Sequence, residues 1–119
     1  MPTVKSSKAK GRLLQQYVRD KILDMFPSLV KDTDVRSAIM GEQGEDIKLS
    51  PKARALMPVS IECKSLAKVA VYNHYEQAMK NAPKGMEPLV VLKANRKKPL
   101  VLMDLDHYME FYRGKVSDS

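Results

Sequence analysis

The chain has 119 residues, 44% hydrophobic and 29% charged, which fits one folded domain with a single core and excludes a disordered chain. Its net charge of +7 favours a polyanionic partner, and nucleic acid is the first expectation. The sequence contains no apolar run near the roughly 20 residues of a membrane span, and its one cysteine excludes an internal disulfide. We therefore expect a cytoplasmic protein that does not associate with membranes.

The first quarter of the chain predicts a basic arm followed by a helix. Residues 1–10 carry three lysines without apolar periodicity, which indicates a flexible arm that can contact phosphates. From Gly11 to Phe26, apolar residues recur at helical spacing, and Pro27 ends the pattern. The last of these apolar positions are Met25 and Phe26, and we expect the whole series to face the core.

Three strands are predicted next. They cover Asp32–Met40, Asp46–Leu49 and Val59–Lys64, with a glycine-bounded turn between the first two. Between the second and third strands, Ser50 and Pro51 form a capping serine and a proline at the first helical position. This pair predicts a short helical turn that ends before Pro58.

The second half predicts a helix, two strands and a last helix. Ala67–Ala82 should be a helix that buries Val71, Tyr72, Tyr75 and Met79. Leu89–Leu92 is a continuous apolar run, typical of a strand covered on both faces, and a basic turn leads to a strand over Leu100–Met103. Asp104 or Asp106 should cap the helix that follows.

Together these elements predict an α/β fold in which helices flank a mixed β-sheet of about five strands. The domain should cover residues 11–113, between the arm of residues 1–10 and a polar tail of residues 114–119.

Two neighbouring strands carry the residues with the clearest chemistry. Because side chains alternate along a strand, Glu62 and Lys64 must share one face, whereas Cys63 points to the other as a small core residue. With Asp46 on the adjacent strand, these side chains could hold a divalent metal ion and orient a water molecule beside a phosphate.

A second acid-x-lysine triplet begins at Asp46 itself and includes Lys48, with Asp32 or Asp34 as its upstream acid. We prefer Glu62 and Lys64 because they end an apolar strand and precede a helix. Such short motifs also arise by chance, so an ordinary surface ion pair is the alternative. The histidines, His74 and His107, lack the spacing of a zinc site and are interpreted as structural or surface residues.

Asp46 and Ile61-Glu62-Cys63-Lys64, in this order of elements, resemble the PD-(D/E)XK nuclease superfamily over about residues 10–112. The similarity is greatest to its small phage-encoded and Holliday-junction-resolvase-like members. It implies a restriction-endonuclease-like fold and Mg²⁺, or Mn²⁺ in its place, bound by Asp46, Glu62 and the backbone carbonyl of Cys63. Lys64 would hold the attacking water and counter the charge on the phosphate, and the products would carry 5′-phosphate and 3′-hydroxyl ends.

The chain departs from that superfamily at two positions. Resolvases often carry a glutamate in the first helix, where this chain has Gln15, so a second strongly bound metal ion is not expected. Glu45 replaces the proline that usually precedes the aspartate. Two further residues match by position. Related resolvases place a serine near the scissile phosphate, which corresponds to Ser37 here. They also often carry a glutamine in the helix after the acid-x-lysine strand, which corresponds to Gln77.

The resemblance implies a DNA substrate with branched structure, cut by a homodimer in the cytoplasm of the host cell if the chain is phage-encoded. Two symmetric nicks suit a twofold dimer. Two alternatives remain open, namely a nicking or repair nuclease on linear or single-stranded DNA and an inactive DNA-binding protein of the same fold. The side chains expected to contact DNA phosphates are basic: Lys8, Lys10, Arg12, Arg36, Lys93, Arg96, Lys97 and Lys98.

Overall fold

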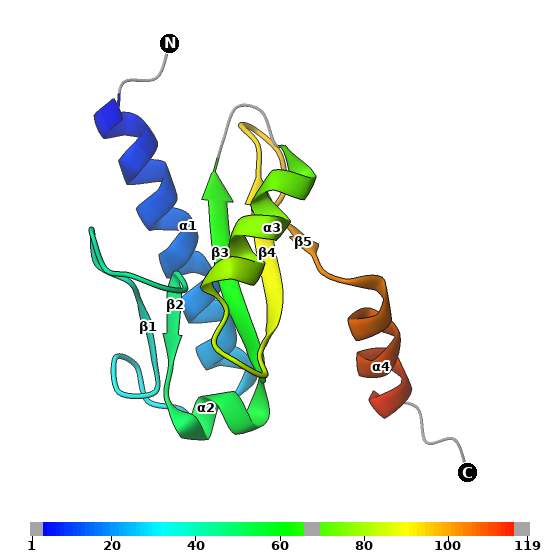
Figure 1. Ribbon diagram of the computed structural model, residues 1–119. Coiled ribbons are helices and arrows are strands. Elements are labelled where there is room, and N and C mark those ends of the chain that lie inside the picture. The colour runs from blue at the N-terminus through cyan, green and yellow to red at the C-terminus, as the bar shows by residue number, and fades with distance from the viewer. Residues whose placement is uncertain (1–3, 66–69, 116–119) are drawn as a thin grey trace.

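A three-stranded sheet lies between two helices (Figure 1). The computed structural model describes residues 4–65 and 70–115. In the sheet, β3 (Val59–Ser65) pairs in parallel with β4 (Glu87–Lys93), and β5 (Leu100–Leu102) pairs antiparallel with β4. Helix α1 (Val4–Met25) covers one face and α3 (Val71–Asn81) covers the other. The parallel pair of strands therefore has the helix-covered faces that parallel strands require.

The remaining two strands form a separate sheet. Strand β1 (Val35–Ser37) pairs antiparallel with β2 (Ile47–Leu49), and the single five-stranded sheet that we expected is therefore wrong. Each of these strands has only three residues, and helix α2 (Pro51–Leu56) turns the chain away directly after β2. A hydrogen bond from the Asp46 N–H to the Ile61 carbonyl, 3.0 Å, joins the two sheets. Asp46 thus stands at the junction between them.

The core divides between the two faces of the larger sheet. On the α1 side, Leu14 and Ile22 pack with Ile61 and with the smaller sheet, whose Val35 and Ile47 are completely buried. On the α3 side, Ala78 packs against Val90 and Leu92, which point the other way from Leu89 and Val91. Burial of all four residues of the apolar run confirms that β4 is covered on both faces.

Several element boundaries differ from expectation. Helix α1 begins at Val4, so residues 4–10 continue the helix rather than form an arm, and residues 1–3 lie outside the described residues. Strand β1 is much shorter than Asp32–Met40, because Asp32 has a left-handed φ of 67° and Met40 lies in the turn. The described part of α3 begins at Val71, and residues 67–69 of the expected helix are not described.

The buried face of α3 also differs from the prediction. Val71, Tyr72 and Met79 are exposed, with 80% of Tyr72 accessible, whereas Tyr75 packs on the core as predicted, together with Ala78. The small Ala78 side chain allows the helix to approach β4 closely. Met25, expected in the core, is likewise exposed because it lies in the last turn of α1.

Helix α4 (Leu105–Lys115) projects away from the rest of the molecule and is capped by Asp104, whose Oδ2 accepts from the His107 N–H at 2.9 Å. Residues 116–119 of the expected polar tail are not described. No helix within residues 4–65 and 70–115 has the length and apolar character to cross a membrane.

Asp34 connects the end of α1 to the start of α2. Its carboxylate accepts from the Val30 N–H at 2.8 Å and from the Ser50 hydroxyl at 2.7 Å, while the Ser50 Oγ accepts from the Ala53 N–H. These hydrogen bonds, led by the one from Val30, hold the pKa of Asp34 below its ordinary value. Ser50 thus caps α2, as the sequence predicts.

We expect Asp34→Ala to lower the midpoint of thermal unfolding by several degrees, because the Val30 N–H and the Ser50 hydroxyl, both in partly buried hydrogen bonds, lose their acceptor. Because the pKa of Asp34 is lowered, its ionised carboxylate stabilises the folded protein above the ordinary pKa. This contribution is lost as the pH falls through the folded-state pKa. The loss on mutation should therefore be larger at pH 7 than at pH 3 by circular dichroism. Asp32→Asn, at an exposed neighbouring acid, is the control and should change the midpoint little.

Candidate active site

Asp46 is held against the open edge of β3 by two hydrogen bonds. Its N–H donates to the Ile61 carbonyl at 3.0 Å, and its Oδ2 accepts from the Cys63 N–H at 2.9 Å. Because the N–H and C=O of one strand residue point to the same edge, the Cys63 carbonyl also faces Asp46 and not β4. The Asp46 carboxylate is thereby fixed beside the acid-x-lysine segment.

Glu62 lies on the α3 side of β3 and is 2% exposed. Its Oε1 accepts a hydrogen bond from the Asn81 Nδ2 at 3.1 Å. Burial, followed by the charge of nearby Asp46, raises the pKa of Glu62 to about 7, while Asn81 opposes the rise. The two carboxyl groups are therefore close enough to interact, although Asp46 lies just before β2 and the two strands belong to different sheets.

Lys64 contributes the cation of this cluster. Its positive charge opposes the rise in the pKa of Glu62, and together with burial it lowers the pKa of His74 on α3. His74, Ala78 and Asn81 are spaced by four and three residues, which places them on one face of α3. The sequence indicates His74 only as a structural or surface residue and does not indicate Asn81. The signal that points to Asn81 is its helical spacing from the small residue Ala78 on this face.

Cys63 points to the α1 side and belongs to the core, where burial raises the pKa of its thiol. This environment suits a packed side chain and not a nucleophile.

The rival triplet is engaged elsewhere. The Lys48 Nζ donates to the Gln43 carbonyl at 2.5 Å and lies 4.0 Å from the Glu42 carboxylate, within the turn that joins β1 and β2. Gly41 and Gly44 in this turn adopt φ values of 85° and 89°, which few other residues tolerate. The geometry thus favours Lys64 over Lys48 as the partner of Asp46 and Glu62.

Three other expected site residues form no hydrogen bond to this cluster in the described parts of the chain. Gln15 and Ser37 are half-buried and Gln77 is exposed. The hydrogen bonds within the described parts of the chain connect none of them to Asp46, Glu62 or Lys64.

Glu45 anchors the segment just before Asp46. It is 5% exposed, and one carboxylate oxygen accepts a hydrogen bond from the Arg54 guanidinium of α2. The other oxygen, Oε2, and the Arg54 Nη1 are buried without a partner in the described structure. The residue that replaces the usual proline thus forms a buried ion pair that ties the site to α2.

The site offers three oxygen ligands for a cation: two carboxylates and the Cys63 carbonyl. The described residues contain no group of three or more His, Cys, Asp or Glu side chains suited to a metal. Mg²⁺ prefers oxygen, is commonly held by one or two carboxylates, and keeps several water ligands. The pKa of Glu62 is raised by burial and then by the charge of Asp46, and a cation here would offset the second of these effects. The donor set therefore fits one Mg²⁺ ion and does not suggest a second.

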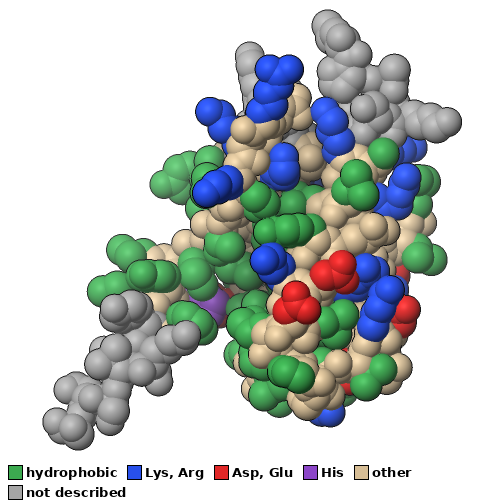
Figure 2. Space-filling model, turned by 180° about the vertical axis from the view of Figure 1, so that it is seen from behind, with side chains coloured by type: hydrophobic (Ala, Val, Ile, Leu, Met, Phe, Trp, Pro, Cys, Tyr) green, Lys and Arg blue, Asp and Glu red, His purple; other side chains and the backbone are tan. Residues whose placement is uncertain are grey.

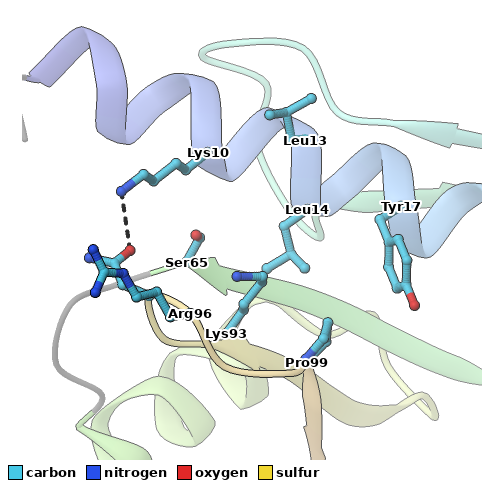
Figure 3. Close-up of a pocket in the computed structure, with 9 residues that line it drawn as sticks. Lys10, Leu13, Leu14, Tyr17, Ser65, Lys93, Arg96 and Pro99 are labelled. Atoms are coloured by element: carbon cyan, nitrogen blue, oxygen red, sulfur yellow. Dashed lines mark hydrogen bonds between the residues drawn. The ribbon is translucent and has the colours of Figure 1, made fainter.

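The expected DNA-contacting residues divide into two groups. Lys10, Lys93 and Arg96 line a groove of about 600 Å³ together with Tyr17, Leu13 and Pro99 (Figure 3), which we call the basic groove. Figure 2 shows Lys and Arg side chains gathered at this end of the molecule. Lys8, Arg12, Lys97 and Lys98 are also exposed.

Arg36 is committed differently, because its Nη1 and Nη2 donate to both carboxylate oxygens of Glu42 at 2.9 and 2.7 Å. This pairing raises the pKa of Arg36 and directs its donors away from a ligand.

The raised pKa of Glu62 predicts a pH-dependent stability in metal-free solution. The folded-state pKa of Glu62 is near 7, above the usual 4.5, so the protonated carboxyl group stabilises the folded protein. This contribution to the unfolding free energy is complete below pH 4.5 and is lost as the pH rises through 7. Glu62→Gln removes the ionisable group and can keep the hydrogen bond from Asn81. We expect the variant to exceed the wild type in unfolding free energy by about 2 kcal/mol at pH 8 and by little at pH 5. Urea titrations with chelator test this, and an equal difference at both pH values would contradict it.

No family model, curated protein or solved structure matches the chain at a significant level. The function therefore has to follow from the residues themselves.

Proposed function

We propose that the protein is a Mg²⁺-dependent DNA endonuclease that hydrolyses phosphodiester bonds in branched DNA, with the fold and chemistry of the PD-(D/E)XK nucleases. The observation that carries the proposal is the convergence of Asp46, Glu62 and Lys64 at the meeting point of the two sheets. Two carboxylates and a lysine in one cluster, in a chain of net charge +7, suit a phosphodiester substrate.

Each residue has a role that follows from its place. Asp46 and Glu62, with the Cys63 carbonyl, would hold the cation, and Mg²⁺ bound there would supply Lewis-acid polarisation of the phosphate and a water of lowered pKa. Asn81 orients the Glu62 carboxylate through its hydrogen bond of 3.1 Å. Lys64, whose positive charge acts on Glu62, would position the attacking water and stabilise the negative charge that develops on the phosphate.

The arrangement of the sheet supports the same proposal in part. The order of α1, the β1–β2 hairpin, β3, α3 and β4 matches the order expected from the resemblance, although the strands divide into two sheets. The preference for branched DNA rests on the resemblance to junction resolvases. Cutting two opposed strands of a four-way junction requires two active sites, so the proposal includes a homodimer.

The test is a cleavage assay on a four-way junction, a linear duplex and a single strand of the same sequence, each with Mg²⁺ or with chelator. We expect paired nicks in the junction only when Mg²⁺ is present. Binding without metal-dependent cleavage would rule out the nuclease. Equal cutting of linear duplex would retain a nuclease but rule out the preference for branched DNA.

A further inference from the structure

The basic groove has two chemically different sides. Lys10 on α1, Lys93 at the end of β4 and Arg96 in the turn after β4 supply cations. Leu13 and Tyr17 supply an apolar side, and 65% of the first and 48% of the second remain accessible. A ligand that satisfies both sides carries an anionic group next to a flat apolar one.

The parts of the groove are held in place by the fold. The Lys10 Nζ donates to the Asn95 Oδ1 at 3.1 Å, a contact between residues 85 apart in the sequence that ties α1 to the β4–β5 turn (Figure 3). Leu14, buried beside the exposed Leu13, fixes the rotation of α1 over the sheet. The Lys21 Nζ lies 5.4 Å from the centre of the Tyr17 ring, at the side of the next helical turn. The Tyr17 ring and the cation of Lys10 lie on α1, Lys93 lies at the end of β4, and Arg96 lies in the turn that Lys10 ties to α1.

Arg96 occupies a costly backbone conformation. Its φ of 62° lies in the left-handed region, where glycine and asparagine are favoured and a long side chain is strained. The turn closes through a hydrogen bond from the Lys97 N–H to the Ala94 carbonyl at 3.2 Å. A left-handed φ alone does not mark a functional position, since Asp32 has one as well, but glycine would form this turn with less strain. Compared with glycine, arginine at this position adds a long basic side chain that lines the groove.

A nucleotide that is not base-paired combines the two features. In a duplex the faces of the bases are stacked on one another and cannot reach a side chain, whereas an unpaired base exposes its face for stacking. The volume of about 600 Å³ lies within the range of small-ligand sites. Neither inorganic phosphate nor a DNA backbone alone would use Tyr17 and Leu13.

We propose that the basic groove binds an unpaired nucleotide of single-stranded DNA, with its phosphate at Lys93 and Arg96 and its base against Tyr17 and Leu13. The inference rests on the proposed function for DNA as the ligand, and it deepens that function by adding an unpaired segment beside the branch point, such as a flap or an opened arm, to the substrate. It does not require cleavage, so the two can fail separately.

Fluorescence anisotropy in chelator tests the proposal with a labelled 12-nucleotide oligothymidine and a 12-base-pair duplex. We expect tighter binding of the single strand. Tyr17→Leu keeps an apolar side chain but removes the ring, and it should weaken single-strand binding about tenfold while changing duplex binding little. Thymidine monophosphate should displace the single strand at lower concentration than inorganic phosphate.

Arg96→Gly separates binding from folding. It relieves the left-handed strain, so its thermal midpoint should equal or exceed that of the wild type while single-strand binding falls and becomes less dependent on salt. Lys31→Gln removes one positive charge from an exposed site between α1 and β1, outside the groove, and serves as the matched control. It should affect single-strand binding much less than Arg96→Gly.

Three results would overturn the proposal. They are equal affinity for single strand and duplex, no effect of Tyr17→Leu, and displacement by phosphate as efficient as by the mononucleotide. Junction cleavage together with any of these would retain the nuclease and reject the nucleotide site. Selective single-strand binding without cleavage would do the reverse.

Discussion

Replacing Glu62 with glutamine is expected to abolish Mg²⁺-dependent cleavage, with a loss of at least about a thousandfold in rate, while DNA binding in chelator remains. The side chain keeps its size and can still accept from the Asn81 Nδ2, so the fold is preserved. What is lost is the second carboxylate beside Asp46. Lys64→Met should have an effect of similar size, because it removes the cation whose charge acts on Glu62. Single-turnover cleavage of a junction measures both.

Lys48→Met is the matched control. Lys48 belongs to the rival triplet and donates to the Gln43 carbonyl, so its loss should affect the β1–β2 turn and leave the cleavage rate within a few fold. Loss of cleavage in this variant, with full activity in Lys64→Met, would show that the other triplet carries the chemistry. Retained cleavage in Glu62→Gln would remove this residue from the site.

Glu45→Ala should destabilise the protein by about 3 kcal/mol, since it leaves the Arg54 guanidinium partly buried without its carboxylate. A loss of this size is a large fraction of the stability of a small domain. The pair is already poorly satisfied, with the Glu45 Oε2 and the Arg54 Nη1 unpartnered in the described structure. Urea unfolding with circular dichroism gives the free energy of unfolding.

Asp20→Ala provides the comparison. Asp20 pairs with Arg19 at 2.9 Å, but 60% of its side chain is exposed, so its loss should cost less than about 1 kcal/mol. A cost for Glu45→Ala no greater than for Asp20→Ala would show that the buried pair contributes little. Arg54→Ala should match Glu45→Ala, because it strands the other partner.

The strands of the larger sheet could be predicted because β3 and β4 are apolar segments whose burial is signalled locally. The division into two sheets could not be predicted, because it depends on the path of the chain through α2 between β2 and β3. In the described parts of the chain, only the Asp46 N–H, just before β2, reaches the Ile61 carbonyl of β3 through a backbone hydrogen bond. The buried face of α3 was mispredicted for a similar reason. Periodicity favours the large side chains of Tyr72 and Met79, whereas the sheet accepts the small Ala78.

The site shows the same limit. The proximity of Asp46 and Glu62 is expected from the sequence, but it arises from the hydrogen bonds of Asp46 to β3 at the junction of two sheets and not from pairing within one sheet. Asn81 could not be predicted, because its partner Glu62 lies 19 positions away and the contact depends on the rotation of α3. The basic groove combines residues from α1 and from the β4–β5 turn, which no local pattern connects.

The backbone contact of Asp46 with β3 has a consequence for motion. The smaller sheet consists of two three-residue strands and meets the larger sheet where Asp46 donates to the Ile61 carbonyl. A hairpin of this size is marginal without packing and should open locally more often than β3 and β4. A cation shared by Asp46 and Glu62 would clamp the two sheets together. Hydrogen–deuterium exchange at the amides of β1 and β2 would then slow on addition of Mg²⁺, and would report metal binding in a protein that is not turning over DNA.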